Sequence, residues 1–319
     1  MKCKICGNDH SDKIIYAKDM NYGGDEKFTY FQCSKCKCLQ LENIPSNMEK
    51  YYGSGYYSLN MKKHKKGIAE KLISAFSQLR DKQLIQNRKG IINKICCKMQ
   101  PRIAYELIPQ LCPNKNSTIL DVGCGDGYLL KLLYDIGWKK LYGVDLYGGE
   151  GYKNDEIAIQ TGTIFDIYGQ FDLIMFHHSF EHMEQPFEIM KKVYSLLKGK
   201  NSYCMICIPI STCYAFERYK ENWVQLDAPR HFFLHSPDSM ELIAKNSDLQ
   251  IDKIIYDSNS FQIIGSQMYE QGELGIERRT LKNTVKYAFK SIMKYSREAE
   301  LLNQKARGDQ AIFLLRKRD

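Results

Sequence analysis

Apolar positions in the second half of the chain fall into short, nearly continuous runs separated by segments with helical spacing. The runs predict strands at residues 118–121, 141–145, 157–160, 171–176 and 203–208, and the spacing between them predicts helices at 128–136 and 187–197. Strands that are apolar along their whole length, alternating with helices, are typical of a parallel sheet covered on both faces. We therefore predict an α/β fold for residues 116–319.

A glycine-rich turn follows the first of these strands. Asp121 ends the strand, glycines stand at positions 123, 125 and 127, and a second carboxylate, Asp145, ends the next strand. Glycines allow a tight strand-to-helix turn and a close approach of the backbone to a ligand, and a carboxylate about 20 residues further on binds ribose hydroxyls. The pattern predicts a site for a nucleoside.

The charge of the turn indicates which nucleoside. A dinucleotide would place its pyrophosphate at the helix N-terminus, where the carboxylate of Asp121 would repel it. S-adenosylmethionine carries an ammonium and a sulfonium, which Asp121 attracts. The spacing Gly-x-Gly-x-Gly also differs from the dinucleotide pattern Gly-x-Gly-x-x-Gly.

Two further segments extend this pattern into a family resemblance. Residues 171–176 are followed by His177-His178-Ser179-Phe180-Glu181-His182 and then Pro186, and residues 223–231 end in Pro229-Arg230-His231. With the glycine turn, these segments resemble the class I S-adenosylmethionine-dependent methyltransferases, and in particular those that act on sugars and surface glycans. The resemblance covers roughly residues 115–319. It implies a Rossmann-like seven-stranded sheet whose last two strands, near 251–256 and 310–316, pair antiparallel, with residues 260–308 as a helical cap on the substrate side.

The resemblance also implies the cofactor site, because ligands of open α/β sheets bind at the carboxyl ends of the strands. The glycines would surround the methionine moiety, Asp145 would bind the ribose, and Thr163 would replace an acidic residue found in many relatives. The cofactor-binding residues predicted in this way are Asp121, Gly123, Cys124, Gly125, Gly127, Asp145, Leu146, Thr163, Ile164 and His177.

Methyl transfer to a sugar hydroxyl benefits from a general base, and a histidine with an ordinary pKa of about 6.5 suits that role near neutral pH. Relatives place such a histidine in the loop after the fifth strand, which predicts His231 as the base. His182, at the start of the helix after the fourth strand, is predicted as a second catalytic residue that orients the acceptor, and fixing that helix start is its structural alternative. His178 and Arg230 are predicted to contact the substrate. Anchoring of the loop is the structural alternative for His231, and a bond to a phosphate or a backbone carbonyl is the alternative for Arg230.

Two Cys-x-x-Cys pairs, Cys3/Cys6 and Cys33/Cys36, stand near the start of the chain. Two such turns supply four thiolates for tetrahedral zinc and leave no open position for a substrate. We predict a structural zinc ribbon over residues 1–45. Cys38 could replace Cys36, and His10 is another alternative ligand.

Residues 46–115 connect the ribbon to the sheet. They begin with a tyrosine-rich segment in which Tyr56 and Tyr57 are predicted to contact the cofactor or acceptor, with packing between the domains as the alternative. Residues 61–115 hold thirteen Lys and Arg against three acids, and apolar spacing predicts helices at 68–79, from 91 and at 101–111. A second basic stripe comprises Lys282, Lys286, Lys290 and Lys294. Solvated helix faces explain most such runs, and an anionic partner such as a sugar pyrophosphate, a membrane surface or RNA is the alternative.

Composition limits the remaining classes. The chain has 319 residues, a net charge of +9 and 44% hydrophobic residues, and no apolar stretch reaches the roughly 18 residues of a membrane span. Its start has no apolar segment typical of a secretory signal, so we expect a cytoplasmic protein with reduced cysteines. The predicted function is methyl transfer from S-adenosylmethionine to a sugar or related small molecule, plausibly a nucleotide-linked sugar or a surface-glycan precursor. An RNA base methyltransferase is the main alternative, and a non-catalytic binding protein is another.

Overall fold

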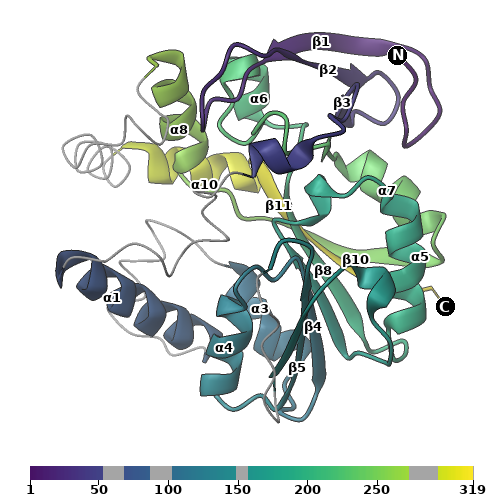
Figure 1. Cartoon of the computed structure of the whole chain (residues 1–319), viewed down its shortest axis with the longest axis vertical. Helices are drawn as coiled ribbons and strands as arrows, with labels where there is room; N and C mark the ends of the chain where they lie inside the picture. Colours follow the sequence, from purple (N-terminus) through teal and green to yellow (C-terminus); the bar gives the residue numbers. More distant parts are fainter. Residues whose placement is uncertain (53–67, 87–102, 149–156, 273–293, 319) are drawn as a thin grey trace.

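The computed structural model describes residues 1–52, 68–86, 103–148, 157–272 and 294–318 (Figure 1). Several sequence predictions lie outside these residues. They are the roles of Tyr56 and Tyr57, the helix expected from residue 91, and most of the lysine stripe at 282–294.

Seven strands form the central sheet, in the order β10-β11-β8-β7-β4-β5-β6. The five parallel strands are β4 (Thr118–Val122), β5 (Lys140–Asp145), β6 (Ile157–Thr161), β7 (Leu173–His177) and β8 (Tyr203–Pro209). Each overlaps a strand predicted from its apolar run. The chain winds outward from β4 to β6 and then returns to the other side of β4, so the direction of winding switches between β4 and β7.

Alternate residues of these strands face two different cores. In β4, Ile119 belongs to the cluster beneath α3 and α4, whereas Leu120 belongs to the cluster beneath α5 and α7. Because side chains of a strand alternate between the faces, a strand covered on both sides must be apolar at every position. This explains the continuous apolar runs in the sequence.

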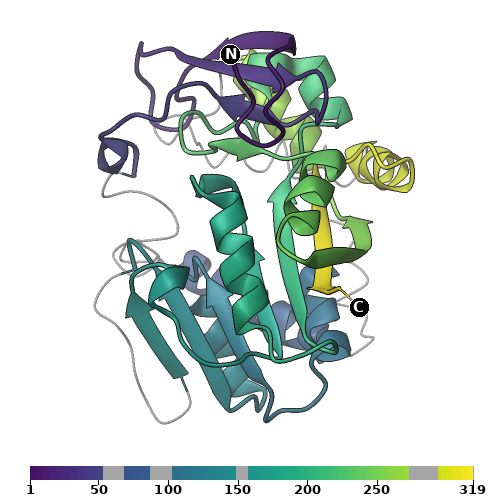
Figure 2. The same cartoon turned by 90° about the vertical axis from the view of Figure 1, so that its right-hand side faces the viewer.

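Helices cover both faces (Figures 1 and 2). On one side lie α1 (Ile68–Ile85), α3 (Ile103–Leu111) and α4 (Tyr128–Asp135), and on the other lie α5 (Pro186–Leu196) and α7 (Pro237–Lys245). Their apolar residues recur at helical spacing, and Pro186 and Pro237 occupy first helical positions, where a missing N–H breaks no hydrogen bond. No helix in the described ranges combines the length and the apolar character needed to cross a bilayer.

The last two strands form the antiparallel end of the sheet. β10 (Leu249–Tyr256) pairs antiparallel with β11 (Gln310–Lys317), and β11 pairs antiparallel with β8. This confirms the predicted antiparallel pair. Between them lie α8 (Phe261–Glu270) and α10 (Ser296–Gln304), which are the described parts of the predicted helical insertion.

A smaller sheet lies across one end of the large one (Figure 2). It contains β1 (Ser11–Ala17), β2 (Phe28–Cys33), β3 (Leu39–Leu41) and β9 (Phe233–Leu234), in that order. The fourth strand comes from the segment after β8, and the cysteines of the N-terminal part share one buried cluster with Phe176 and Ile206 of the large sheet. The module predicted at 1–45 is therefore completed by residues from the second half of the chain.

Short helical segments lie between the strands and longer helices. They are η1 (Met48–Tyr51), η2 (Ile164–Asp166), η3 (Phe180–His182), α6 (Tyr214–Tyr219) and η4 (Lys220–Asn222). η3 begins shortly after β7 ends, and Tyr52, which follows η1, places its hydroxyl 3.3 Å from Nδ1 of His182 in η3.

Candidate active site

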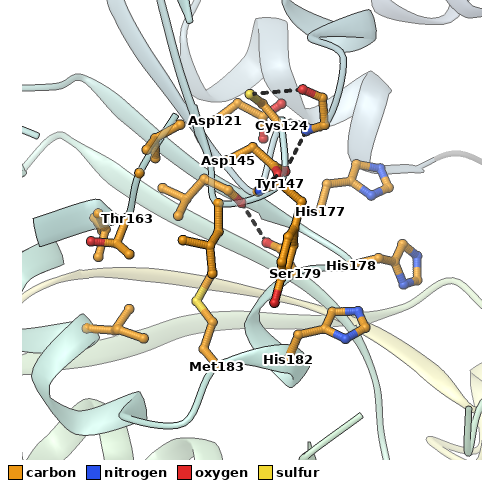
Figure 3. A pocket seen from close by; sticks show the side chains of 18 of the residues that line it. Asp121, Cys124, Asp145, Tyr147, Thr163, His177, His178, Ser179, His182 and Met183 are labelled. Atoms are coloured by element: carbon orange, nitrogen blue, oxygen red, sulfur yellow. Dashed lines mark hydrogen bonds between the residues drawn. The ribbon is translucent and has the colours of Figure 1, made fainter. Parts of the chain in front are cut away.

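A cavity of about 640 Å³ opens at the carboxyl ends of β4, β5, β6 and β7 (Figure 3). This is where the winding of the sheet reverses, which is the usual ligand position in open α/β sheets. Of the predicted cofactor residues, the cavity is lined by Asp121, Gly123, Cys124, Gly125, Asp145, Leu146, Thr163, Ile164 and His177. Gly127 instead stands at the start of α4, in a left-handed conformation with φ 73°.

The glycine turn is shaped by close packing against the residues that follow β7. Gly123 has φ 77°, and a Cβ atom at this position would collide with the side chain of Ser179. The Ser179 hydroxyl donates a hydrogen bond to the carbonyl of Val122 at 2.6 Å. Only glycine therefore fits at position 123, and the backbone of the turn stays open toward the cavity.

The two carboxylates of the predicted nucleoside site differ in their bonding. Asp145 accepts hydrogen bonds from the backbone N–H groups of Gly125 (2.8 Å) and Tyr147 (2.9 Å). Asp121 is buried, and its Oδ1 has no hydrogen-bond partner among the described residues. Burial and the nearby charge of Asp145 raise the pKa of Asp121 to about 7. A cationic ligand beside Asp121 would supply the missing partner, which is the fit expected of an ammonium group and not of a pyrophosphate.

Histidines form the wall of the cavity that continues from β7. His177, His178 and His182 all line it, and His178 has the positive φ of 55° that is uncommon outside glycine. Figure 3 shows the three rings on the same side of the cavity. The predicted substrate contact of His178 and the predicted catalytic role of His182 are thus compatible with their positions.

His231 lies behind this wall. Its ring centroid is 4.7 Å from that of His182, but its side chain is buried and is not part of the cavity lining. Burial and the neighbouring His182 lower the pKa of His231 to about 4, so its ring is neutral at neutral pH. His231 reaches the cavity through His182.

Arg230 makes internal contacts. Its guanidinium is completely buried and bonds to both oxygens of Asp19 (2.7 and 2.9 Å) and both oxygens of Asp227 (2.6 and 3.0 Å). It also donates to the carbonyl of Tyr51 at 3.1 Å. The bond to the Tyr51 carbonyl fits the backbone-carbonyl alternative for Arg230, and the guanidinium joins the loop at 227–231 to the N-terminal module.

Two residues of the site, Tyr52 and Glu181, were not predicted from the sequence. Tyr52 lines the cavity, stacks on Tyr147 with centroids 4.8 Å apart, and places its hydroxyl 3.3 Å from Nδ1 of His182. It belongs to the same tyrosine-rich segment as Tyr56 and Tyr57, so the composition of that segment was the signal that could have identified it. Glu181 is fully buried next to His178, His182 and His231. Burial raises the pKa of Glu181, but these histidines outweigh that effect and lower the pKa to about 2.

The four predicted zinc ligands converge at the N-terminal end of the small sheet. The Sγ atoms of Cys3 and Cys36 are 3.6 Å apart, those of Cys6 and Cys33 are 3.4 Å apart, and all four lie within 4.8 Å of one another. Thiolates at about 2.3 Å from a tetrahedral zinc ion are separated by roughly 3.8 Å. Cys38 points elsewhere, toward His235 at 4.0 Å, and His10 is exposed beside Asp9. The cluster supports Cys36 as the fourth ligand.

A mainly parallel sheet with a glycine turn and two carboxylates at the ends of adjacent strands is typical of nucleoside-binding α/β proteins. The family described as "Methyltransferase domain" matches residues 95–254, half of the chain, and the protein belongs to this family. The resemblance seen in the sequence is thereby confirmed at the level of the domain.

Two curated proteins match part of the chain. The mitochondrial ubiquinone biosynthesis O-methyltransferase of Saccharomyces cerevisiae is 30% identical over 115 residues, which cover 32% of this chain and 37% of that protein. The malonyl-[acyl-carrier protein] O-methyltransferase of Priestia megaterium is 32% identical over 116 residues, which cover 33% of this chain and 42% of that protein. The match thus spans well under half of either relative.

Solved structures are similar at lower identity. The mycolic acid cyclopropane synthase CmaA1, complexed with SAH and CTAB, has a TM-score of 0.44 and 14% identity, with 68% of this chain and 86% of that chain covered. A putative sarcosine dimethylglycine methyltransferase from Galdieria sulphuraria has a TM-score of 0.45 and 16% identity, with 74% and 89% covered.

Proposed function

We propose that this protein transfers a methyl group from S-adenosylmethionine to a hydroxyl group of a sugar or related small molecule, such as a nucleotide-linked sugar or a glycan precursor in the cytoplasm. The observation that carries the proposal is the buried carboxylate of Asp121. Its Oδ1 has no hydrogen-bond partner in the part of the chain that the structure describes, and it lies in a cavity that histidines also line. Family membership supplies the reaction class.

The cavity residues divide into a cofactor end and an acceptor end. When bound, S-adenosylmethionine supplies an electrophilic methyl group on a sulfonium. Asp121 would bind its ammonium group and Asp145 its ribose, while Leu146, Thr163 and Ile164, which also line the cavity, would contact the adenine. The turn at Gly123 leaves space for the methionine moiety because it carries no side chain.

At the acceptor end, the protein must position a hydroxyl group and assist the loss of its proton. Tyr52 and the histidine wall enclose this part of the cavity, and His182 with His231 behind it would activate the hydroxyl. Positioning supplies most of the rate in such a displacement, and activation of a weak nucleophile adds roughly 10²–10⁴-fold.

A zinc ion held by Cys3, Cys6, Cys33 and Cys36 belongs to the same proposal, with a structural role. The thiolates are supported by N–H donors, since the Gln40 side chain donates to Cys3 Sγ at 3.1 Å and the Ile5 backbone does so at 3.4 Å. Four cysteines fill the coordination sphere, so zinc would stabilise the small sheet without touching the substrate.

Two measurements test the proposal. Calorimetry should show binding of S-adenosylhomocysteine and no binding of a nicotinamide dinucleotide, and the reverse result would overturn the cofactor assignment. Release of S-adenosylhomocysteine should then be measured with nucleotide-linked sugars, a quinol, an acyl-carrier protein and RNA. Turnover with the sugars supports the acceptor class, whereas turnover with RNA alone would favour the base methyltransferase.

His182→Ala and His231→Ala should each lower kcat by at least about 100-fold on the true acceptor.

A further inference from the structure

Three side chains with metal-binding atoms meet at the acceptor end of the cavity. One donor atom each of Glu181, His182 and His231 lies within 4.8 Å of the other two. His182 lines the cavity, and Glu181 and His231 are buried directly behind it. This group is separate from the four cysteines and from the cofactor end of the cavity.

Glu181 is a buried carboxylate without hydrogen bonds. Neither of its oxygens has a hydrogen-bond partner among the described residues, and its side chain is 0% exposed. The nearest nitrogen atoms are His178 Nδ1 at 3.6 Å and His231 Nε2 at 3.8 Å from Oε1, both beyond normal hydrogen-bond length. A buried ionised carboxylate requires a cation or donors nearby, and here the space between it and the histidines is where a cation would lie.

The Nδ1 contacts of the two histidines assign the tautomer that metal-binding histidines usually have. Nδ1 of His231 is 2.7 Å from the Gln225 carbonyl, and Nδ1 of His182 is 2.8 Å from the Arg230 carbonyl. A carbonyl oxygen only accepts, so in both rings Nδ1 carries the hydrogen and the neutral ring presents a lone pair at Nε2. Metal-bound histidines typically donate their other N–H group to a carbonyl or carboxylate in this way.

Nε2 of His231, which therefore carries the lone pair, lies 3.8 Å from Oε1 of Glu181. Two acceptors in this arrangement repel each other unless a cation lies between them. Their separation of 3.8 Å is within the roughly 4.2 Å that two ligands at about 2.1 Å from one ion can span.

We propose that Glu181, His182 and His231 bind a divalent transition-metal ion, and that this ion binds the acceptor. This inference rests on the proposed function and specifies how the histidines activate the hydroxyl. Three protein ligands leave coordination positions open for substrate. Two adjacent oxygen atoms would occupy them best, so the acceptor class is a vicinal diol or a similar pair of neighbouring oxygens, as in a sugar ring.

The step balances with residues of the same wall. The hydroxyl held by the ion would lose its proton to His178, which lines the cavity and has its Nδ1 3.6 Å from Oε1 of Glu181. The acceptor oxygen attacks the methyl carbon, a C–O bond forms, and the C–S bond breaks with its electron pair going to sulfur. The products are the methyl ether, neutral S-adenosylhomocysteine and protonated His178.

Binding of Mn²⁺ to the zinc-loaded full chain is the direct test, measured by electron paramagnetic resonance of the free ion. Mn²⁺ prefers oxygen and nitrogen ligands, so the four cysteines do not compete for it. We expect one Mn²⁺ per chain in the wild type. Absence of Mn²⁺ binding at millimolar concentration would overturn the proposal.

Matched variants locate the ion. Glu181→Gln and His182→Ala should each weaken Mn²⁺ binding at least roughly tenfold. Glu188→Gln, the same change at an exposed position on α5, should bind Mn²⁺ like the wild type. His182→Ala keeps the test valid if Glu181→Gln fails to fold, and zinc content with the melting temperature identifies that case. Equal Mn²⁺ affinity in His182→Ala and Glu188→Gln would place the ion elsewhere and refute the assignment.

His178→Gln separates this inference from the proposed function. This variant should keep Mn²⁺ binding and S-adenosylhomocysteine binding but lose turnover, because only the proton acceptor is removed. If the wild type binds S-adenosylhomocysteine and methylates a sugar in the presence of a chelator that removes Mn²⁺ completely, the proposed function stands and the metal site fails.

Discussion

Asp121 and Glu181 are two buried carboxylates in one cavity region with opposite electrostatic surroundings. Burial and Asp145 raise the pKa of Asp121 to about 7, whereas three histidines lower the pKa of Glu181 to about 2 despite its burial. Asp121 therefore gains most from a cationic ligand, and Glu181 is ionised and already surrounded by groups that bind a proton or a metal. The sequence motif predicted the first of these residues. The second depends on histidines that come together only in the fold.

Affinity for S-adenosylmethionine should rise with pH around neutrality. Since the pKa of Asp121 is raised to about 7 in the free protein, its carboxyl group is largely protonated at pH 6 and ionised at pH 8, and only the ionised form attracts the ammonium group. Asp121→Asn should lower affinity about tenfold at pH 8 and remove most of the pH dependence. Calorimetry at both pH values checks this. A wild-type affinity that falls between pH 6 and pH 8 would contradict it.

Gly123→Ala should damage the cofactor turn. The variant places a methyl group against Ser179 and requires alanine to adopt a backbone φ of 77°. The collision and the strained backbone together should cost about 1–3 kcal/mol of folding free energy and weaken cofactor binding. Gly199→Ala is the matched control, because a Cβ there meets no atom within 4 Å. Urea unfolding and calorimetry of both variants provide the measurement, and equal effects of the two substitutions would show that the turn tolerates a side chain.

At the scale of elements, the strands of the large sheet were predictable from local sequence, because burial on both faces requires an apolar residue at nearly every position. The fourth run was predicted at 171–176, but β7 spans Leu173–His177, since Phe171 makes only an isolated bridge with Leu197. β9 could not be predicted, because its two residues become a strand only by pairing with β3 nearly two hundred positions earlier. The contacts of Arg230 could not be predicted for the same reason, because its partner Asp19 is distant in sequence. The Pro-Arg-His motif indicated that Arg230 lies near the site but not which residues it bonds.

The link between Asp19 and Arg230 should be a major contribution to stability. Asp19→Asn removes one of two carboxylates from a guanidinium that is completely buried, and breaking such a pair costs about 3–5 kcal/mol. The control is Asp25→Asn, which breaks the exposed pair with Lys18 and should leave stability unchanged within error. Denaturant unfolding of the two variants decides the point, and a similar small effect for both would mean that the buried pair is dispensable.

At the scale of the whole molecule, the small sheet and the large sheet form one structural unit. β9 belongs to the small sheet, Ile210 at the end of β8 pairs with His235, and Ser211 bonds to the carbonyl of Lys37 at 2.6 Å. The Ser236 hydroxyl donates to the carbonyl of Cys36 itself. Residues 231–236 thus connect His182, which packs on His231, with Cys36, which accepts the bond from Ser236. Loss of the metal ion or of one of the four thiols should therefore disturb the acceptor end of the cavity, although no cysteine of the cluster lines the cavity.

Loss of zinc should consequently reduce activity as well as stability. Cys36→Ser removes one ligand, so the variant should contain well below one zinc ion per chain and should melt at a lower temperature. It should reduce kcat more than the affinity for S-adenosylmethionine, because the cofactor turns lie on the far side of the cavity from the small sheet. Cys38→Ser is the control, since Cys38 is equally buried but lies outside the group of four thiols. It should keep one zinc ion. Elemental analysis, thermal melting and calorimetry are sufficient to compare the two. If Cys38→Ser loses zinc while Cys36→Ser retains it, the fourth ligand is Cys38, and the connection from metal to loop must then run through His235, the neighbour of that thiol.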